Sequence, residues 1–262
     1  MKTKRFLLSC LFTASLFTAV AEASESGALA YRAQKSLEAG KIAKSYSQLE
    51  RALLASRKES DLLSESRILI SMAQIRTMSL DLDFADSLLS VVRPGALDNG
   101  TSLLLEKSKV ALANARGLYE NGVKVCRSMD SDSLSRAAKP LQGAIYSECA
   151  MAYAGGGKSA DAEEALKMVG KKLSKDGTLY TFTAARVSHL LKQPEADSLY
   201  RAAEKISIQN NKPYTTASIL YYRGLLLKKR NPNEARDLFL RSENAFDLMG
   251  LPNNKKRSEK EK

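Results

Sequence analysis

The sequence is poor in the residues that most often carry chemistry: its 262 residues include one His, three Cys and no Trp. Cys10 lies in an apolar amino-terminal segment that we expect to be removed, which leaves two Cys and one His. These cannot make a standard zinc site, which needs four ligands such as four Cys or two Cys with two His. A Ser-His-Asp or Cys-His arrangement would have to use His189, and nothing local orients that ring. We therefore expect His189 to lie on a helix surface. We also expect a protein that is not an enzyme and holds no metal and no cofactor.

Proline is also scarce, with six residues in the chain. From Ala28 to Gly250, apolar residues recur at intervals of three and four, which is the period of one helix face, and strand-like alternation is almost absent. Each Pro falls between these runs or in a first turn, where its missing N–H costs little. The sequence therefore predicts an all-α fold.

The glycine-rich segment Ala152–Ser159 resembles a relaxed phosphate-binding loop, with Ala in place of the first Gly. A functional phosphate loop follows a buried strand, whereas residues 145–153 have the period of a helix. We interpret the segment as a turn between two helices.

The formal net charge is +12, yet residues 24–252 contain no long block of one sign. Diffuse basic charge can attract nucleic acid or anionic lipid, but no nucleic-acid motif is present, so we expect no nucleic-acid partner. Residues 253–262 contain five Lys or Arg, two Glu and no apolar side chain. Because it has no apolar side chain whose burial could offset the entropy lost on ordering, this basic tail is predicted to be disordered.

Residues 1–23 have the pattern of a secretory signal peptide. A basic start at Lys2–Arg5 precedes an apolar stretch, which ends in small residues at Ala19, Ala21 and Ala23. The stretch of about 15 residues is shorter than the roughly 20 that cross a bilayer, and no later stretch is apolar enough. We expect cleavage after Ala21 or Ala23 and export to the periplasm or the extracellular space.

An alternative for the amino terminus rests on Leu7–Cys10, which resembles a bacterial lipobox. Cys10 would then carry lipid after cleavage. The apolar core would be only Phe6–Ser9, which is short against the usual 7 to 15 residues or so. Under this alternative the chain would meet the membrane through its lipid or through its basic tail.

Small residues recur along the chain at steps of 34 to 40 residues, each after a short turn. These anchors are Ser45, Ala85, Gly122, Ala162, Ala196 and Ala235. Each has a small or slim residue 11 or 12 positions upstream, namely Ala33, Ala73, Val110, Ala150, Ala184 and Gly224. Small residues at both places let two antiparallel helices approach closely. The pattern predicts an α-solenoid of about six helix-turn-helix hairpins over residues 24–252.

Two of the six units carry the fullest pattern. The fourth has Tyr146, Cys149, Ala150, Tyr153, Ala162 and Leu166, and the fifth has Tyr180, Ala184, Ala196, Tyr200 and Ala203. With Gly40-Lys41-Ile42 and Gly117-Leu118-Tyr119 at turns, the chain resembles the tetratricopeptide repeat, a helix-turn-helix unit of about 34 residues. It departs from that family in having no Trp, in steps mostly longer than 34, and in Ser242 where Ala is usual.

The resemblance implies that the first helix of each hairpin lines a concave face that binds extended peptides or partner helices. By helical phase, the exposed residues of that face are Arg67, Ser71, Gln74, Lys107, Asn114, Ser147, Glu148, Met151, Thr181, Ser188, Tyr221 and Lys228. We expect a non-enzymatic, exported adaptor or scaffold that binds a protein or peptide partner in a bacterial envelope. The alternative is a lipid-anchored or membrane-surface factor that acts in envelope assembly.

Stacking of the third and fourth units should bring Cys126 and Cys149 together. Export would leave these two as an even pair in a compartment that permits disulfides. Both positions also suit small apolar residues, so the alternative is two buried free thiols.

Overall fold

The computed structural model describes residues 24–262, so the predictions for residues 1–23, a signal peptide and a lipid on Cys10, lie outside the described residues. The described chain is all-α, as predicted. Its fourteen α-helices and one short 3-10 helix are α2 (Glu25–Glu38), α3 (Ile42–Lys58), α4 (Leu62–Met78), α5 (Leu82–Ser90), η1 (Pro94–Ala96), α6 (Asn99–Arg116), α7 (Tyr119–Ser128), α8 (Ser131–Arg136), α9 (Lys139–Gly155), α10 (Ser159–Lys172), α11 (Thr178–Leu190), α12 (Ala196–Gln209), α13 (Pro213–Leu227), α14 (Pro232–Leu248) and α15 (Pro252–Glu259).

Six sequential hairpins account for most of these helices: α2–α3, α4–α5, α6–α7, α9–α10, α11–α12 and α13–α14. All six predicted anchors lie on the second helix of a hairpin, their upstream partners lie on the first, and all twelve are buried. In the first hairpin, the Ser45 hydroxyl donates a hydrogen bond of 2.8 Å to the carbonyl oxygen of Ala33. The predicted helix crossings and the solenoid arrangement are confirmed.

Local sequence explains where the helices begin and turn. Asp61 and Asp98 accept backbone hydrogen bonds at the starts of α4 and α6, as helix-capping side chains do. Pro occupies the first turn of α9, α13, α14 and α15. Gly157, with φ +72°, makes the turn between α9 and α10, which agrees with the interpretation of the glycine-rich segment as a turn.

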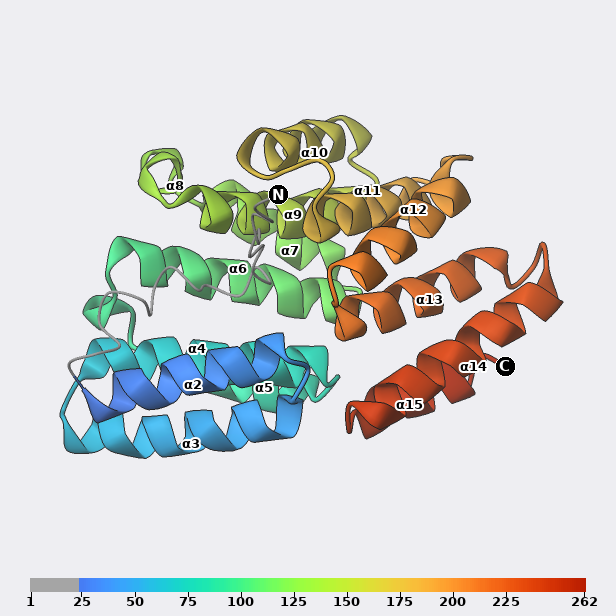
Figure 1. Cartoon of the computed structure of the whole chain (residues 1–262). Coiled ribbons are helices and arrows are strands. Elements are labelled where there is room, and N and C mark those ends of the chain that lie inside the picture. Colours follow the sequence, from blue (N-terminus) through green and yellow to red (C-terminus); the bar gives the residue numbers. More distant parts are fainter. Residues whose placement is uncertain (1–23) are drawn as a thin grey trace, which may run out of the picture.

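The solenoid curves until its last helices lie beside its first hairpins (Figure 1). At this ring closure the Tyr214 hydroxyl donates to the carbonyl oxygen of Met78 at 3.1 Å, and the side-chain amide of Asn254 donates to the same oxygen at 3.0 Å. Asn253 donates to the carbonyl oxygen of Ser79. These two carbonyls lie at the end of α4, where a helix leaves acceptors without partners of its own.

The prediction of a disordered tail at residues 253–262 is wrong, because most of this segment forms α15. Asn254 and Ser258 are fully buried, and Ser258 lies 3.2 Å from the hydroxyl of Ser242. Lys262 pairs with Glu243, and Glu261 pairs with Lys228. The tail is held by hydrogen bonds and ion pairs, whereas the sequence argument considered only apolar burial.

Cys126 of α7 and Cys149 of α9 form a disulfide, with their Cα atoms 5.8 Å apart. Of the two alternatives for this pair, the structure therefore has the bridge and not the free thiols. A structural disulfide points to an oxidising compartment outside the cytoplasm. Within residues 24–262, no helix has both the length and the apolar character to cross a membrane.

Candidate functional site

A cavity of about 420 Å³ lies on the inner side of the curved array. It is lined by the first helices of the second to sixth hairpins, α4, α6, α9, α11 and α13, together with α15. Small-molecule and cofactor sites commonly occupy roughly 300 to 1,000 Å³. The ring closure completes this cavity, because Met78 and Tyr214, which bond across it, both belong to the lining.

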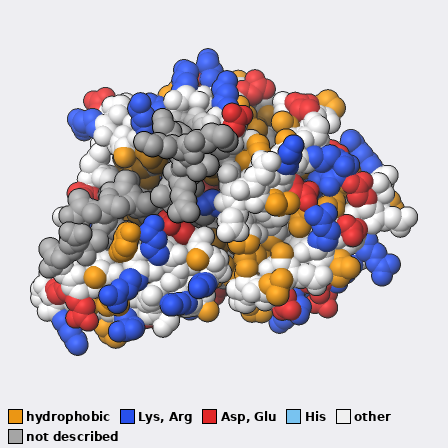
Figure 2. Space-filling view, in the orientation of Figure 1, with side chains coloured by type: hydrophobic (Ala, Val, Ile, Leu, Met, Phe, Trp, Pro, Cys, Tyr) orange, Lys and Arg blue, Asp and Glu red, His pale blue; other side chains and the backbone are white. Residues whose placement is uncertain are grey.

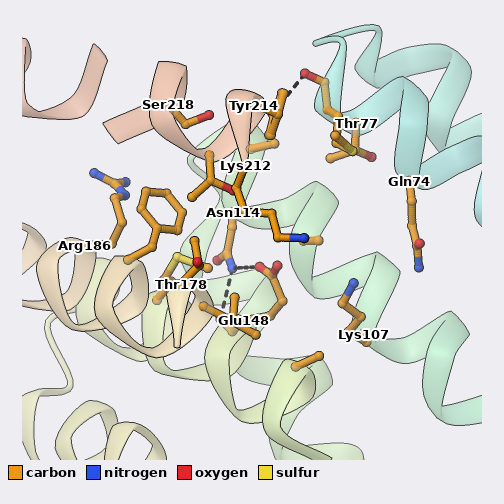
Figure 3. Close-up of a pocket in the computed structure, with 18 of the residues that line it drawn as sticks. Gln74, Thr77, Lys107, Asn114, Glu148, Thr178, Arg186, Lys212, Tyr214 and Ser218 are labelled. Atoms are coloured by element: carbon orange, nitrogen blue, oxygen red, sulfur yellow. Dashed lines mark hydrogen bonds between the residues drawn. The ribbon is translucent and has the colours of Figure 1, made fainter. Parts of the chain in front are cut away.

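Five of the twelve residues predicted for the concave face line this cavity: Gln74, Lys107, Asn114, Glu148 and Met151. They come from α4, α6 and α9, three helices that the repeat pattern placed side by side. Figure 3 shows Asn114 and Glu148 at the centre of the cavity with Lys107 to one side. For these five residues, the phase argument found a shared surface.

The other seven predicted residues do not line the cavity, and most are engaged within the solenoid. Arg67 is buried, pairs with Asp98 and donates to the hydroxyl of Thr101. The Ser147 hydroxyl lies 2.6 Å from the hydroxyl of Thr183, a residue of the next hairpin. Helical phase predicts that Arg67 and Ser147 are exposed. In each case, however, the first helix of the next hairpin covers the side chain.

The remaining five of these residues lie elsewhere on α4, α11 and α13 or at the end of α13. The Ser71 and Thr181 hydroxyls donate to backbone carbonyls one turn earlier on their own helices. Ser188 and Tyr221 are buried, and Lys228 pairs with Glu261 of the tail. The prediction of exposed side chains is therefore wrong for Arg67, Ser147, Ser188 and Tyr221, whereas Lys228 is exposed but lies outside the cavity lining.

One end of the cavity, which we call the lysine end, is formed by Gln74, Lys107, Asn114 and Glu148. The Asn114 amide donates to Glu148 at 3.0 Å. Burial raises the pKa of the Glu148 carboxyl, and Lys107 and Asn114 offset part of that rise. Burial lowers the pKa of the Lys107 ammonium, and Glu148 opposes that change. The opposite charges of Lys107 and Glu148 therefore offset part of the effect of burial on each other's pKa.

Two amide oxygens at the lysine end have no hydrogen-bond partner among the described residues. These are Oε1 of Gln74 and Oδ1 of Asn114, both buried at the atom level. Gln74 uses its Nε2 to donate to Ser108 at 2.9 Å. A buried polar atom without a partner is costly, so these acceptors are suited to receive N–H donors from a ligand.

The opposite end, which we call the arginine end, is formed by Arg186, Tyr222 and Arg257. The guanidinium carbon of Arg186 lies 3.6 Å from the centre of the Tyr222 ring, and that of Arg257 lies 5.7 Å from the same centre. Burial raises the pKa of the Tyr222 phenol, but Arg186 and then Arg257 lower it by more, so the net shift is downward. This end of the cavity is therefore strongly electropositive.

Sequence reasoning missed the arginine end entirely. Arg186 lies on α11 between Thr181 and Ser188, so a different phase on that helix would have found it. Arg257 belongs to the tail that the sequence predicts to be disordered, and its position depends on the folding of α15 onto α14 and on the ring closure. The apolar pattern carried no signal for that second residue.

His189 is partly buried, contrary to the expectation of a surface position. Its Nδ1 lies 3.0 Å from the hydroxyl of Tyr200, and the guanidinium of Arg186 donates to that hydroxyl at 3.4 Å. Burial and then the charge of Arg186 lower the pKa of His189 to about 4. His189 does not belong to the cavity lining. It adjoins the arginine end through Tyr200.

The outer surface differs from the cavity in its charge pattern. On the face seen in Figure 2, Lys and Arg side chains lie among Asp and Glu side chains. Among the described residues that line the cavity, four are basic (Lys107, Arg186, Lys212 and Arg257) and one, Glu148, is acidic. No group of three His, Cys, Asp or Glu residues between positions 24 and 262 is placed to hold a metal ion.

Comparison of the sequence with models of known protein families gives no match, and comparison with curated proteins gives none either. The fold and the cavity therefore define the class of protein: an all-α solenoid of helical hairpins, closed by its own C-terminal helix around a cavity with polar ends.

Proposed function

We propose that this chain is an exported, non-enzymatic binding protein of the tetratricopeptide type, which takes up a short segment of a partner protein in its central cavity. The observation that carries this proposal is the convergence of Gln74, Lys107, Asn114, Glu148 and Met151 on one cavity. All five are positions that the tetratricopeptide resemblance implies for the peptide-contacting face.

The spacing of contacts between hairpins supports the tetratricopeptide assignment. Gln74 bonds to Ser108, Asn114 to Glu148, and Arg127 to Asp161, and each pair is separated by 34 residues. Equivalent positions in neighbouring repeats meet when consecutive hairpins stack with the same rotation. A separation of 34 is the length of the tetratricopeptide unit. Two of the longer anchor steps, from Ala85 to Gly122 and from Gly122 to Ala162, contain the inserted elements η1 and α8.

The polar character of the lysine end supports a peptide as the ligand. The free oxygens of Gln74 and Asn114 can accept hydrogen bonds from backbone N–H groups, which every extended peptide presents. Met151 and Tyr180 add adaptable and flat apolar surface to the lining. Among residues 24–262, the lining holds a single carboxylate, that of Glu148, so these residues offer no acid pair for hydrolysis.

Site-specific photo-crosslinking in the native host tests the proposal. A benzoylphenylalanine at Met151 should yield a discrete crosslinked partner, whereas the same group at Leu54 of α3, which is 60% exposed and outside the cavity lining, should not. Ala111→Trp, which fills the cavity, should abolish the crosslink, and the exposed Ala202→Trp should leave it intact. A crosslink that survives Ala111→Trp would contradict binding in the cavity.

Export is tested separately, by the intact mass of the protein from its host. A mature chain that begins at Glu22 or Ser24 agrees with cleavage of a signal peptide. A lipid-modified Cys10 at the amino terminus would instead establish the membrane-anchored alternative.

A further inference from the structure

We propose that the arginine end of the cavity is a binding site for a small organic acid, with the anionic group beside Tyr222 in the field of Arg186 and Arg257, and the apolar body against Phe182 and Tyr214. This site goes beyond the proposed function, because it lies on α11, α13 and α15 and needs no partner protein.

The charges of the described side chains that line the cavity are not balanced. Glu148 is the one carboxylate of the described lining, and it is matched by Lys107 and Asn114 at the other end. Arg186, Lys212 and Arg257 form no ion pair with any residue between 24 and 262. Elsewhere in the protein a buried arginine, Arg223, meets Asp197 and Glu234. Three cations that line one cavity, none of them in an ion pair with a carboxylate, leave a charge that an anion from outside can balance.

The guanidinium groups of Arg186 and Arg257 lie against neighbouring aromatic rings. Arg186 is held on its site from two directions, by the ring of Tyr222 below its plane and by the hydroxyl of Tyr200 at its edge. Arg257 lies 4.0 Å from the centre of the Tyr221 ring, and its Nε is buried without a partner. Fixed guanidinium groups lose little freedom on binding and present N–H donors in a planar fork that matches carboxylate, phosphate or sulfonate oxygens.

Aromatic rings line the same end of the cavity. Phe182 and Tyr222 lie with their ring centres 6.3 Å apart, and Tyr214 contributes a third ring to the lining. Figure 3 shows Arg186 and Lys107 at opposite sides, with Asn114 and Glu148 between them. The anion is therefore expected at the side away from Glu148. A volume of about 420 Å³ suits a compact aromatic or branched aliphatic acid better than a sugar chain or a long lipid.

The probe for the test is a panel of four acids: phenylacetate, phenyl phosphate, octanoate and 8-anilinonaphthalene-1-sulfonate. Calorimetry should show at least one acid binding with a stoichiometry of one. Phenylacetamide, which matches phenylacetate in shape without its charge, should bind at least about tenfold more weakly than phenylacetate. Failure of all four acids to bind at about 10 mM would overturn the proposal, as would equal affinity for phenylacetate and its amide.

Variants place the bound acid. Arg257→Gln on the C-terminal helix should weaken binding at least about tenfold, and Arg257→Lys should weaken it less, because the charge remains but the fork is lost. Arg236→Gln, at an exposed position of α14, is the matched control and should change nothing. Circular dichroism and the melting temperature show whether each variant is folded. Unchanged affinity in a folded Arg257→Gln would overturn the proposal.

The single histidine gives an independent readout in the unmodified protein. His189 contacts Tyr200, which contacts Arg186, so an anion at the arginine end should move the one imidazole resonance to a saturable limit. Phenylacetamide should not move it. An acid that binds by calorimetry but leaves this resonance unmoved would place the anion elsewhere and overturn the assignment. A photo-crosslinked partner at Met151 would be unaffected by that outcome, so the two proposals fail separately.

Discussion

The hydroxyl of Tyr214 and the carbonyl of Met78 are hydrogen-bonded although 136 residues separate them in sequence. Asn254, fully buried on α15, donates to the same carbonyl oxygen. A solenoid ordinarily contacts only its neighbouring repeats, so these bonds add a long-range constraint to a chain of local ones. They join the second hairpin to the sixth hairpin and to α15, and they complete the cavity.

Breaking the closure should cost stability and loosen the end of α4. Tyr214→Phe and Asn254→Ala each remove one hydrogen bond and should each lower the free energy of unfolding by about 0.5 to 1.5 kcal/mol. Hydrogen exchange should quicken at the turn around residues 78–82, because its acceptors lose their partners. Tyr146→Phe is the control, since that hydroxyl makes no hydrogen bond to the described residues. Unaltered exchange in the double variant would show that the closure does not hold this turn.

The disulfide should be present in the mature protein and should stabilise it. Peptide mapping under non-reducing conditions is expected to recover one linked pair that contains Cys126 and Cys149. A bridge that closes 23 residues contributes about 3 kcal/mol in the chain-entropy model, so reduction should lower the melting temperature. Thiol labelling of both cysteines in freshly isolated, unreduced protein would contradict this prediction.

The lysine end should show energetic coupling between its two charges. Lys107→Met leaves Glu148 without its cation and should cost about 1 to 3 kcal/mol, whereas adding Glu148→Gln should recover part of that loss. Urea titrations of the two single variants and the double variant measure the coupling. The exposed pair Lys167 and Glu164 is the control, and its coupling should be below about 0.5 kcal/mol. Strictly additive losses at Lys107 and Glu148 would show that the two do not interact.

Acid should destabilise the protein partly through His189. Its pKa is about 4 in the folded chain against 6.5 for the ordinary side chain, chiefly because of burial and then because of Arg186. Below pH 6.5 the unfolded state therefore takes up a proton that the folded state does not bind. The stabilising contribution is complete above pH 6.5 and is lost as the pH falls from 6.5 towards 4.

Melting temperatures of the wild type and His189→Gln between pH 8 and 4 test this sign. Carboxylates titrate in both proteins, so the difference between the two curves reports His189. The wild type should therefore lose more stability than the variant over the acid half of the range. Parallel curves for the two proteins would show that His189 does not titrate differently on folding.

The helix crossing in the fourth hairpin should not accept a larger side chain. Ala162 is fully buried on α10 against Ala150 and Ala154 of α9. Ala162→Leu should cost about 1 to 3 kcal/mol through overpacking. Ala160→Leu, two residues earlier on the same helix and exposed, should be nearly neutral. Equal melting temperatures for these two variants would contradict the assigned crossing.

The sequence by itself determined the helices, the six hairpins and the small residues at their crossings. Such features depend on local periodicity and on contacts between adjacent helices, and Ser45 with Ala33 is an example only 12 residues apart. It also indicated five residues of the cavity, because α4, α6 and α9 stack as equivalent helices of consecutive repeats. For Cys126 and Cys149, the sequence predicted that the two residues lie close together but not whether they form a disulfide.

Only the tertiary structure decided which first-helix residues remain accessible and how the array ends. Arg67 and Ser147 matched the phase of the concave face, yet the next repeat covers them through Thr101 and Thr183. The curvature of the solenoid is the sum of small rotations at each hairpin interface, and no single interface encodes it in the apolar pattern. That sum brings Asn254 to Met78, and with α15 folded there, Arg257 of a polar tail becomes part of the cavity wall.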